Sequence, residues 1–209
     1  GRGRTAIPMV LSAVYSLQHI GMGRGRRPFQ VVGVSALDPL SRQATPLLDA
    51  AGRPQASAPE PLSPAAFERF ATLLDSSRIE IDFLTPTRIL REGHLCKEPL
   101  FVPWFQRLLE RLRVMSEVYS TPVWIPFREL LEVAAGVTVA QDATRWQEAW
   151  SYSRYEGRGK PTSGFVGHVQ YVGPLERLLP YLLIGQALQV GKNTVKGCGW
   201  YQIHYRRRG

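Results

Sequence analysis

The alternation of hydrophobic and polar positions divides the chain into segments of helix and strand length. Residues 103–119 form the clearest amphipathic helix, because Pro103 opens the segment and its apolar side chains fall on one face. Residues 79–84 alternate as a half-buried strand does. Other apolar runs predict helices at residues 6–20, 64–74, 127–135 and 175–188. The last of these helices should start or kink at Pro180. Strands are predicted at residues 29–34, 146–155, 165–172 and 200–205.

The order of these segments predicts an α+β fold. From residue 79 onward it is strand, helix, extra helix, strand, strand, helix, strand, which is the βαββαβ pattern of a ferredoxin-like (RRM-like) domain. Near the N-terminus, a helix, a Gly/Arg loop and a strand repeat the order found at the C-terminal end. We therefore expect the last helix and strands of a second, incomplete ferredoxin-like domain at residues 1–52. A Pro-rich linker and a short helix follow at residues 53–78. Residues 79–209 are expected to form a complete C-terminal ferredoxin-like domain with a Gly-rich loop.

The charge is strongly basic and unevenly distributed. The chain has 26 Lys and Arg against 17 Asp and Glu, a formal net charge of +9. No acidic residue precedes Asp38, and none follows Glu176. Ends of one sign suit a polyanionic partner, and RNA, DNA and an anionic membrane all qualify. The alternative is a soluble protein that is basic without such a partner.

The remaining composition argues against several classes of protein. Cys96 and Cys198 are the only cysteines and form no CxxC pair, so neither a disulfide framework nor a zinc site is expected, and a reducing cytoplasm fits. The longest apolar stretch, residues 178–190, is shorter than the roughly 20 residues that span a bilayer. We expect no metal, no cofactor and no membrane partner. The absence of both a signal peptide and an initiating Met is consistent with a cytoplasmic fragment.

The most informative segment for function is the Gly/Lys loop at residues 191–199. Glycines allow close backbone approach to a ligand, and successive N–H groups in such a turn can surround an anion. Two lysines in the same loop favour a nucleic-acid phosphate. The alternative is a structural helix-to-strand connection. The candidate RNA-binding residues here are Gly191, Lys192, Asn193, Thr194, Lys196, Gly197 and Gly199.

Two further basic segments are weaker RNA-binding candidates. The Gly/Arg loop at residues 21–27 contributes Arg24, Arg26 and Arg27, for which solvated surface charge is the alternative. The Gly-rich connection at residues 156–161 contributes Arg158 and Lys160. Just before it, Trp150 and Tyr152 could stack on bases, although the sequence favours packing in the core.

Other charged groups have structural interpretations. In the helix at residues 103–119, acidic side chains balance the arginines, which favours a salt-bridged solvent face for Arg107, Arg111 and Arg113. Among His19, His94, His168 and His204, none has a partner at metal-ligand spacing. We expect His168 to be structural and assign no catalytic residue.

Three segments together resemble the CRISPR repeat-processing endoribonucleases of the RAMP superfamily. They are Phe83-Leu84-Thr85-Pro86-Thr87-Arg88-Ile89-Leu90, Gly164-Phe165-Val166-Gly167, and Gly191-Lys192 with Gly197-Cys198-Gly199. The resemblance covers residues 79–205 best, and Gln189 stands where the family often has a further glycine. Residues 6–37 look like the last helix, loop and strand of the family's first ferredoxin-like domain.

The resemblance implies a function and a mechanism. Members of this family carry two tandem ferredoxin-like domains and cut precursor CRISPR RNA within each repeat without a metal, the ribose 2′-hydroxyl attacking the adjacent phosphate. The family's general base is usually a histidine early in the first domain. We expect this chain to start after that region, so the catalytic residues stay unassigned. Expected partners are CRISPR repeat RNA or crRNA and other CRISPR effector subunits. The alternatives are a non-catalytic RNA-binding subunit of an effector complex, and a basic globular domain with a protein or membrane partner.

Overall fold

The computed structural model describes residues 2–23, 25–53, 55, 60–153 and 157–208. The chain forms two compact units, which are described separately. The first comprises residues 1–62 with 117–121, and the second comprises residues 63–116 with 122–209. Within the described residues, no helix is long and apolar enough to cross a membrane.

The first unit combines one long helix with a two-stranded sheet. Helix α1 (Arg2–Ile20) is followed by the antiparallel strands β1 (Gly33–Leu37) and β2 (Ala44–Asp49). The hydroxyl of Tyr15 in α1 donates to the carbonyl of Asp49 at 2.9 Å. The strand predicted at residues 29–34 is displaced, and β2 was not predicted. Both strands are only partly buried, and Pro46 lies at an irregularity in β2, so neither carries a clear alternating pattern.

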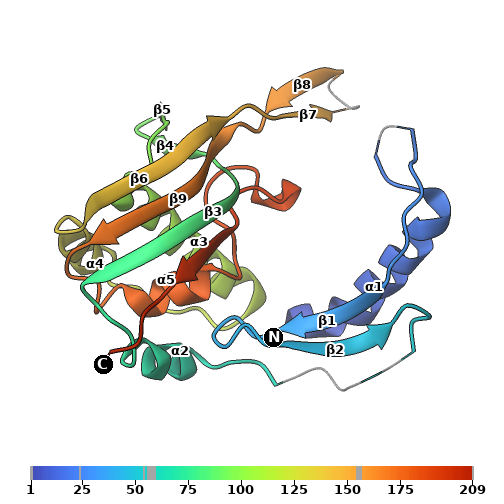
Figure 1. Cartoon of the computed structure of the whole chain (residues 1–209), viewed down its shortest axis with the longest axis horizontal. Coiled ribbons are helices and arrows are strands. Elements are labelled where there is room, and N and C mark those ends of the chain that lie inside the picture. The colour runs from blue at the N-terminus through green and yellow to red at the C-terminus, as the bar shows by residue number, and fades with distance from the viewer. Residues whose placement is uncertain (1, 24, 54, 56–59, 154–156, 209) are drawn as a thin grey trace. The chain divides into compact units, whose positions relative to one another are not determined.

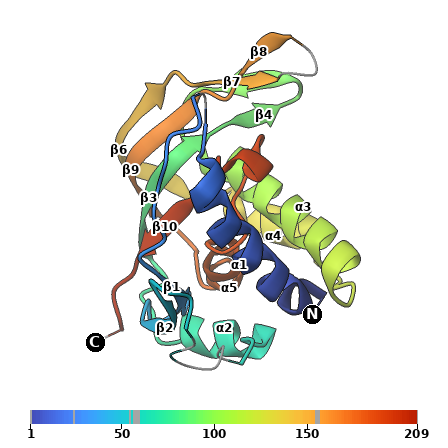
Figure 2. The same ribbon diagram turned by 90° about the vertical axis from the view of Figure 1, so that its right-hand side faces the viewer.

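The second unit contains a four-stranded antiparallel sheet. Its strands are β3 (Arg78–Thr87), β6 (Thr138–Gln147), β9 (Gly164–Val172) and β10 (Tyr201–His204), in the spatial order β10-β3-β9-β6. Helices α3 (Phe101–Tyr119) and α5 (Leu179–Gly185) lie on the same face of this sheet (Figures 1 and 2). The order and connections are those of a ferredoxin-like βαββαβ fold, which confirms the predicted fold class.

Smaller elements decorate this fold. Helix α2 (Pro64–Ala71) packs against α5, and α4 (Phe127–Ala134) precedes β6. One hairpin joins β4 (Ile89–Arg91) to β5 (His94–Cys96), and another joins β7 (Trp150–Ser153) to β8 (Arg158–Pro161). A single 3-10 turn, η1 (Thr194–Lys196), lies within the Gly/Lys loop. Helix α5 begins at Leu179, immediately before Pro180, as predicted.

The second strand of the βαββαβ pattern was predicted in the wrong place. The expected strand at residues 146–155 is the end of β6 followed by β7, and the expected loop at residues 156–161 contains β8. Strand β6 is the edge of the sheet, paired with β9 alone, and most of its side chains are exposed. An exposed edge strand needs no alternating apolar residues, so the pattern gave no signal for β6.

The core of the second unit is an aromatic cluster between the sheet and α3. Trp104 is fully buried, and Phe83, Tyr171 and Tyr201 contact its indole ring with centroids 5.0–6.3 Å away. The buried tyrosine hydroxyls are satisfied, because that of Tyr201 donates to the carbonyl of Leu182 and that of Tyr171 to the carbonyl of Pro99. This packing fixes the strand ends from which the candidate site is built.

Candidate nucleic-acid interface

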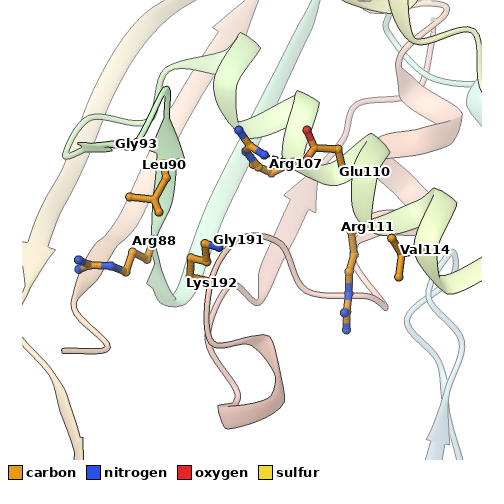
Figure 3. Close-up of a pocket in the computed structure, with 9 residues that line it drawn as sticks. All are labelled: Arg88, Leu90, Gly93, Arg107, Glu110, Arg111, Val114, Gly191 and Lys192. Carbon is orange, nitrogen blue, oxygen red and sulfur yellow. Dashed lines mark hydrogen bonds and ion pairs between the residues drawn. The ribbon is translucent and has the colours of Figure 1, made fainter. Parts of the chain in front are cut away.

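A basic pocket of about 410 Å³ lies at one edge of the second unit. Its side chains come from the β3–β4 connection, the β4–β5 hairpin, α3 and the Gly/Lys loop (Figure 3). The lining includes four cations, Arg88, Arg107, Arg111 and Lys192, and one carboxylate, Glu110, for a formal net charge of +3. A concave surface of one sign raises the local concentration of a charged ligand of the opposite sign.

The three arginines of the pocket and Glu110 are held in place by bonds to the protein. Arg107 forms an ion pair with Glu110 at 2.6 Å, and each side chain of the pair is about one third exposed (35% and 34%). Arg111 donates to the carbonyl of Leu188 at 3.3 Å, and Arg88 donates to the carbonyl of Ser163 at 3.3 Å. Each of these bonds uses only part of a guanidinium, which has five N–H donors, so the arginines retain donors for a ligand.

The Gly/Lys loop is bound tightly to the neighbouring chain. The N–H of Lys192 donates to the carbonyl of Arg88 at 3.0 Å, and Val190 and Gly199 are joined by a bond of 2.8 Å. A Cβ on Gly199, whose φ is +79°, would lie 2.0 Å from the carbonyl oxygen of Val190. Glycine is therefore required at position 199 by the protein's own packing, whether or not a ligand binds.

Several N–H groups of the loop are already occupied. Those of Lys192, Lys196, Gly197, Cys198 and Gly199 donate to backbone carbonyls of the protein itself. For the N–H groups of Gly191, Asn193, Thr194 and Val195, no acceptor is found among the described residues. An anion bound by this loop would meet these four N–H groups and the lysine side chains.

The two lysines of the loop lie at different places. Lys192 lines the basic pocket, whereas the ammonium of Lys196 donates to the hydroxyl of Ser151 in β7 at 2.6 Å. Lys196 therefore links the Gly/Lys loop to the β7–β8 hairpin. Burial raises the pKa of the adjacent Cys198 thiol, more than the charge of Lys196 lowers it, so this thiol is a poor nucleophile at neutral pH.

The β7–β8 hairpin carries an exposed aromatic face, and the expectation that these rings pack in the core is wrong. Trp150 is 68% exposed and Tyr152 is 70% exposed. They alternate along β7 opposite Pro161 and Gly159, and a Cβ on Gly159 would lie 3.5 Å from the indole of Trp150. Figure 1 shows the hairpin continuing outward from β6 and β9. Such a pair of rings with an open face can stack on unpaired bases.

The other predicted basic residues lie in varied settings. Lys160 faces Ser151 across the β7–β8 hairpin, and the backbone of Arg158 belongs to β8. In the first unit, backbone bonds between Met22 and Arg27 close the Gly/Arg loop, which leaves Arg26 and Arg27 exposed. Arg24 lies outside the described residues.

The three arginines of the pocket were not among the binding residues predicted from the sequence. Arg88 follows β3 directly, and Arg107 and Arg111 are four residues apart on α3, a spacing that places them on the same helix face. The predicted ion pair with Glu110 is present, but it borders a pocket rather than open solvent. The i, i+4 arginine pair was the available signal. Among the described residues, no group of three or more His, Cys, Asp or Glu side chains could hold a metal ion.

Solved structures with a similar fold carry the name Cas6. A product complex of a Thermus thermophilus Cas6 matches with a TM-score of 0.51 and 19% identity, covering 69% of this chain and 56% of that chain. A second Cas6 product complex matches with a TM-score of 0.53 and 17% identity, covering 95% and 72%. A partial Cas6-RT-Cas1–Cas2 complex matches with a TM-score of 0.51 and 16% identity, covering 75% and 29%.

At these identities the structural matches establish the fold, and the chain spans just over half the length of the first of them. No protein of curated function matches the sequence. The family model of the CRISPR-associated endoribonuclease Cas6 matches residues 81–201, a segment that begins within β3, ends at the first residue of β10 and includes the basic pocket and the Gly/Lys loop. Because this match extends over more than half of the chain, the protein belongs to the Cas6 family of CRISPR-associated endoribonucleases.

Proposed function

We propose that the second unit binds CRISPR repeat RNA through the basic pocket and the Gly/Lys loop. The observation that carries the proposal is the net charge of +3 around a pocket that lies within the family match. Phosphates of an RNA strand would bind Arg88, Arg111 and Lys192, whose cationic groups form charge-assisted hydrogen bonds with phosphate oxygens. The N–H groups of Gly191, Asn193, Thr194 and Val195 would add donors at the loop.

We further propose that the protein takes part in metal-independent processing of precursor CRISPR RNA. In that reaction a ribose 2′-hydroxyl attacks the adjacent phosphate, a base accepts its proton, and an acid protonates the leaving 5′-oxygen. Cations beside the phosphate stabilise the charge of the transition state. The proposal assigns no residue to the base or the acid. Cleavage of a repeat RNA in EDTA tests it, and binding without cleavage would favour a non-catalytic RNA-binding subunit.

Residues 1–52 would be the end of a first ferredoxin-like domain, connected by residues 53–78 to the second domain at residues 79–209. The free thiols of Cys96 and Cys198 are compatible with a reducing cytoplasm. Other CRISPR proteins are proposed partners, by analogy with the complex that contains Cas6, RT, Cas1 and Cas2.

Removing two cations of the pocket is expected to weaken RNA binding without unfolding the protein. In the variant Arg88→Ala/Lys192→Ala, affinity for a single-stranded repeat RNA should fall about tenfold for each lost phosphate contact. The slope of log K against log salt should become shallower by about 0.7 for each contact. Fluorescence anisotropy across a salt series measures both quantities.

A matched control uses two exposed cations that lie outside the pocket and pair with acidic residues of α4. Arg128 is almost fully exposed (94%) and pairs with Glu132, and Arg177 is also exposed (56%) and pairs with Glu129. Arg128→Ala/Arg177→Ala removes the same formal charge and should change affinity and slope only slightly. Equal losses in the two double variants would show that overall charge, rather than the pocket, governs binding.

Truncating the exposed aromatic ring should weaken RNA binding while leaving stability unchanged. Trp150→Ala is expected to lower affinity for single-stranded RNA by about tenfold, because one base–aromatic stack contributes about 1–3 kcal/mol. The free energy of unfolding should change by less than about 0.5 kcal/mol, since the ring is largely exposed. Trp124→Ala, which removes an indole that is 79% exposed in another loop, is the control and should leave affinity unchanged.

A further inference from the structure

Two histidines and an aspartate form a cluster on the sheet face opposite to α3 and α5. Phe83, Val169 and Tyr201 are buried on the helix-covered face, so the alternate residues Asp82, His168 and His204 lie on the other face. Asp82 in β3 is directly opposite His168 in β9, and His204 in β10 is one diagonal step away. None of the three lines the basic pocket.

Both imidazoles share the carboxylate of Asp82. Nδ1 of His168 lies 2.8 Å from Oδ1, and Nε2 of His204 lies 2.7 Å from Oδ2. These bonds orient the two rings, whose centroids are 6.4 Å apart. Nε2 of His168 and Nδ1 of His204 have no acceptor or donor among the described residues. The side chains of His168 and His204 are 35% and 43% exposed, so each ring can offer its second nitrogen to a ligand.

The fixed charges around the cluster nearly cancel. Glu80 is held by Gln170 at 3.2 Å and by Arg206 at 3.8 Å. Asp75 and Arg78 also lie beside His204. On the other side, Ala143 of β6 is opposite His168, and Arg145 lies two residues further along β6. Of these groups, Asp75, Glu80 and Asp82 are acidic and Arg78, Arg145 and Arg206 are basic. The net charge of this surface is therefore set by the two histidines.

Asp82 keeps its charge over the range in which histidines titrate. Burial opposes its ionisation, but the hydrogen bonds and the charges of His168 and His204 together outweigh burial and hold the pKa of Asp82 below its ordinary value. Histidine side chains ordinarily change charge near pH 6.5. Protonation of both rings would take this surface from a formal charge of about zero to about +2, with one outward N–H on each ring.

We propose that the His168–Asp82–His204 cluster binds a phosphate group of RNA when the two histidines are protonated. When protonated, Nε2 of His168 and Nδ1 of His204 can each donate a charge-assisted hydrogen bond to a phosphate oxygen. The carboxylate behind the rings compensates part of their charge and fixes their orientation. This second site rests on the proposed RNA-binding function and adds a pH-dependent contact outside the basic pocket.

The test compares the wild-type chain with the double variant His168→Asn/His204→Gln at two pH values. The Asn and Gln amides can still donate to Asp82 from the positions of Nδ1 and Nε2, so the variant keeps the bonds that hold the strands but loses the titratable charge. We expect wild-type affinity for single-stranded RNA to be about tenfold higher at pH about 5.5 than at pH about 8. The double variant should lose this increase in affinity, although it retains His19 and His94. The control variant His94→Ala should show the same increase as the wild type.

The same experiment separates the two proposals. Arg88→Ala/Lys192→Ala should bind RNA more weakly at both pH values, yet keep the increase at low pH. An identical pH dependence in the wild type and in His168→Asn/His204→Gln would overturn the cluster as a phosphate site and leave the pocket untouched. Titration with inorganic phosphate at low pH, followed by the ring proton signals of the histidines, tests the site without RNA. Signals that respond to inorganic phosphate but not to RNA would identify a free-phosphate site, and signals that respond to neither would refute the proposal.

Discussion

Trp104→Ala is expected to destabilise the second unit by about 4 kcal/mol, the largest effect that a single truncation should have. The indole is fully buried at the centre of the aromatic cluster, where it contacts rings from β3, β9 and β10 as well as Phe101. Truncation would leave a cavity bordered by three strands and α3. Since the rigid strands cannot collapse into that space, most of the packing energy should be lost.

Urea unfolding followed by circular dichroism measures the change, and Trp104→Phe is the informative companion. Within the described part of the chain, Nε1 of Trp104 is buried without a hydrogen-bond partner. Phenylalanine removes that unsatisfied donor while keeping an aromatic ring, so its cost should be only about 1 kcal/mol. If both substitutions destabilised the protein equally, the indole N–H would have to be bonded, and our account of the core would be wrong.

Gly199→Ala is expected to cost about 3 kcal/mol and to displace the Gly/Lys loop. A left-handed φ costs a non-glycine residue about 1–2 kcal/mol, and forcing a methyl into packed backbone costs about 1–3 kcal/mol more. The added Cβ would overlap the carbonyl oxygen of Val190 and lie 2.8 Å from its N and C atoms. These are backbone atoms, which cannot rotate away as a side chain can. Because Val190 precedes the loop that carries Lys192, RNA affinity should fall as well.

Gly197→Ala measures the cost of the left-handed backbone conformation without a steric clash. Gly197 has nearly the same φ, +83° against +79°, but a Cβ there would have no neighbour within 4 Å. Its cost should therefore be only the conformational part, about 1 kcal/mol, with little change in RNA binding. Chemical denaturation and RNA titration of the two variants give the comparison. Equal destabilisation by Gly197→Ala and Gly199→Ala would show that the close approach to Val190 is not what fixes this loop.

Much of the fold of the second unit was predictable from local pattern. The amphipathic spacing in α3, the alternation in β3 and the helix start before Pro180 each follow from short-range rules. Strand β6 was not predicted because an edge strand with exposed side chains has no hydrophobic alternation. The β7–β8 hairpin was not predicted because its aromatic residues resemble core residues in composition. These residues are exposed only because the hairpin lies beyond the main sheet.

The candidate site was likewise predictable only in part from the sequence. The sequence alone identified a basic chain, the Gly/Lys loop with Lys192 and Lys196, and the family, because glycine spacing and charge are local properties. Only the tertiary structure brought Arg88, Arg107 and Arg111 to the same pocket as Lys192, and joined Asp82 to His168 and His204, which are 86 and 122 residues distant. Such groupings depend on strand order and on how a helix lies against a sheet. Those long-range pairings leave no periodic trace in a single sequence.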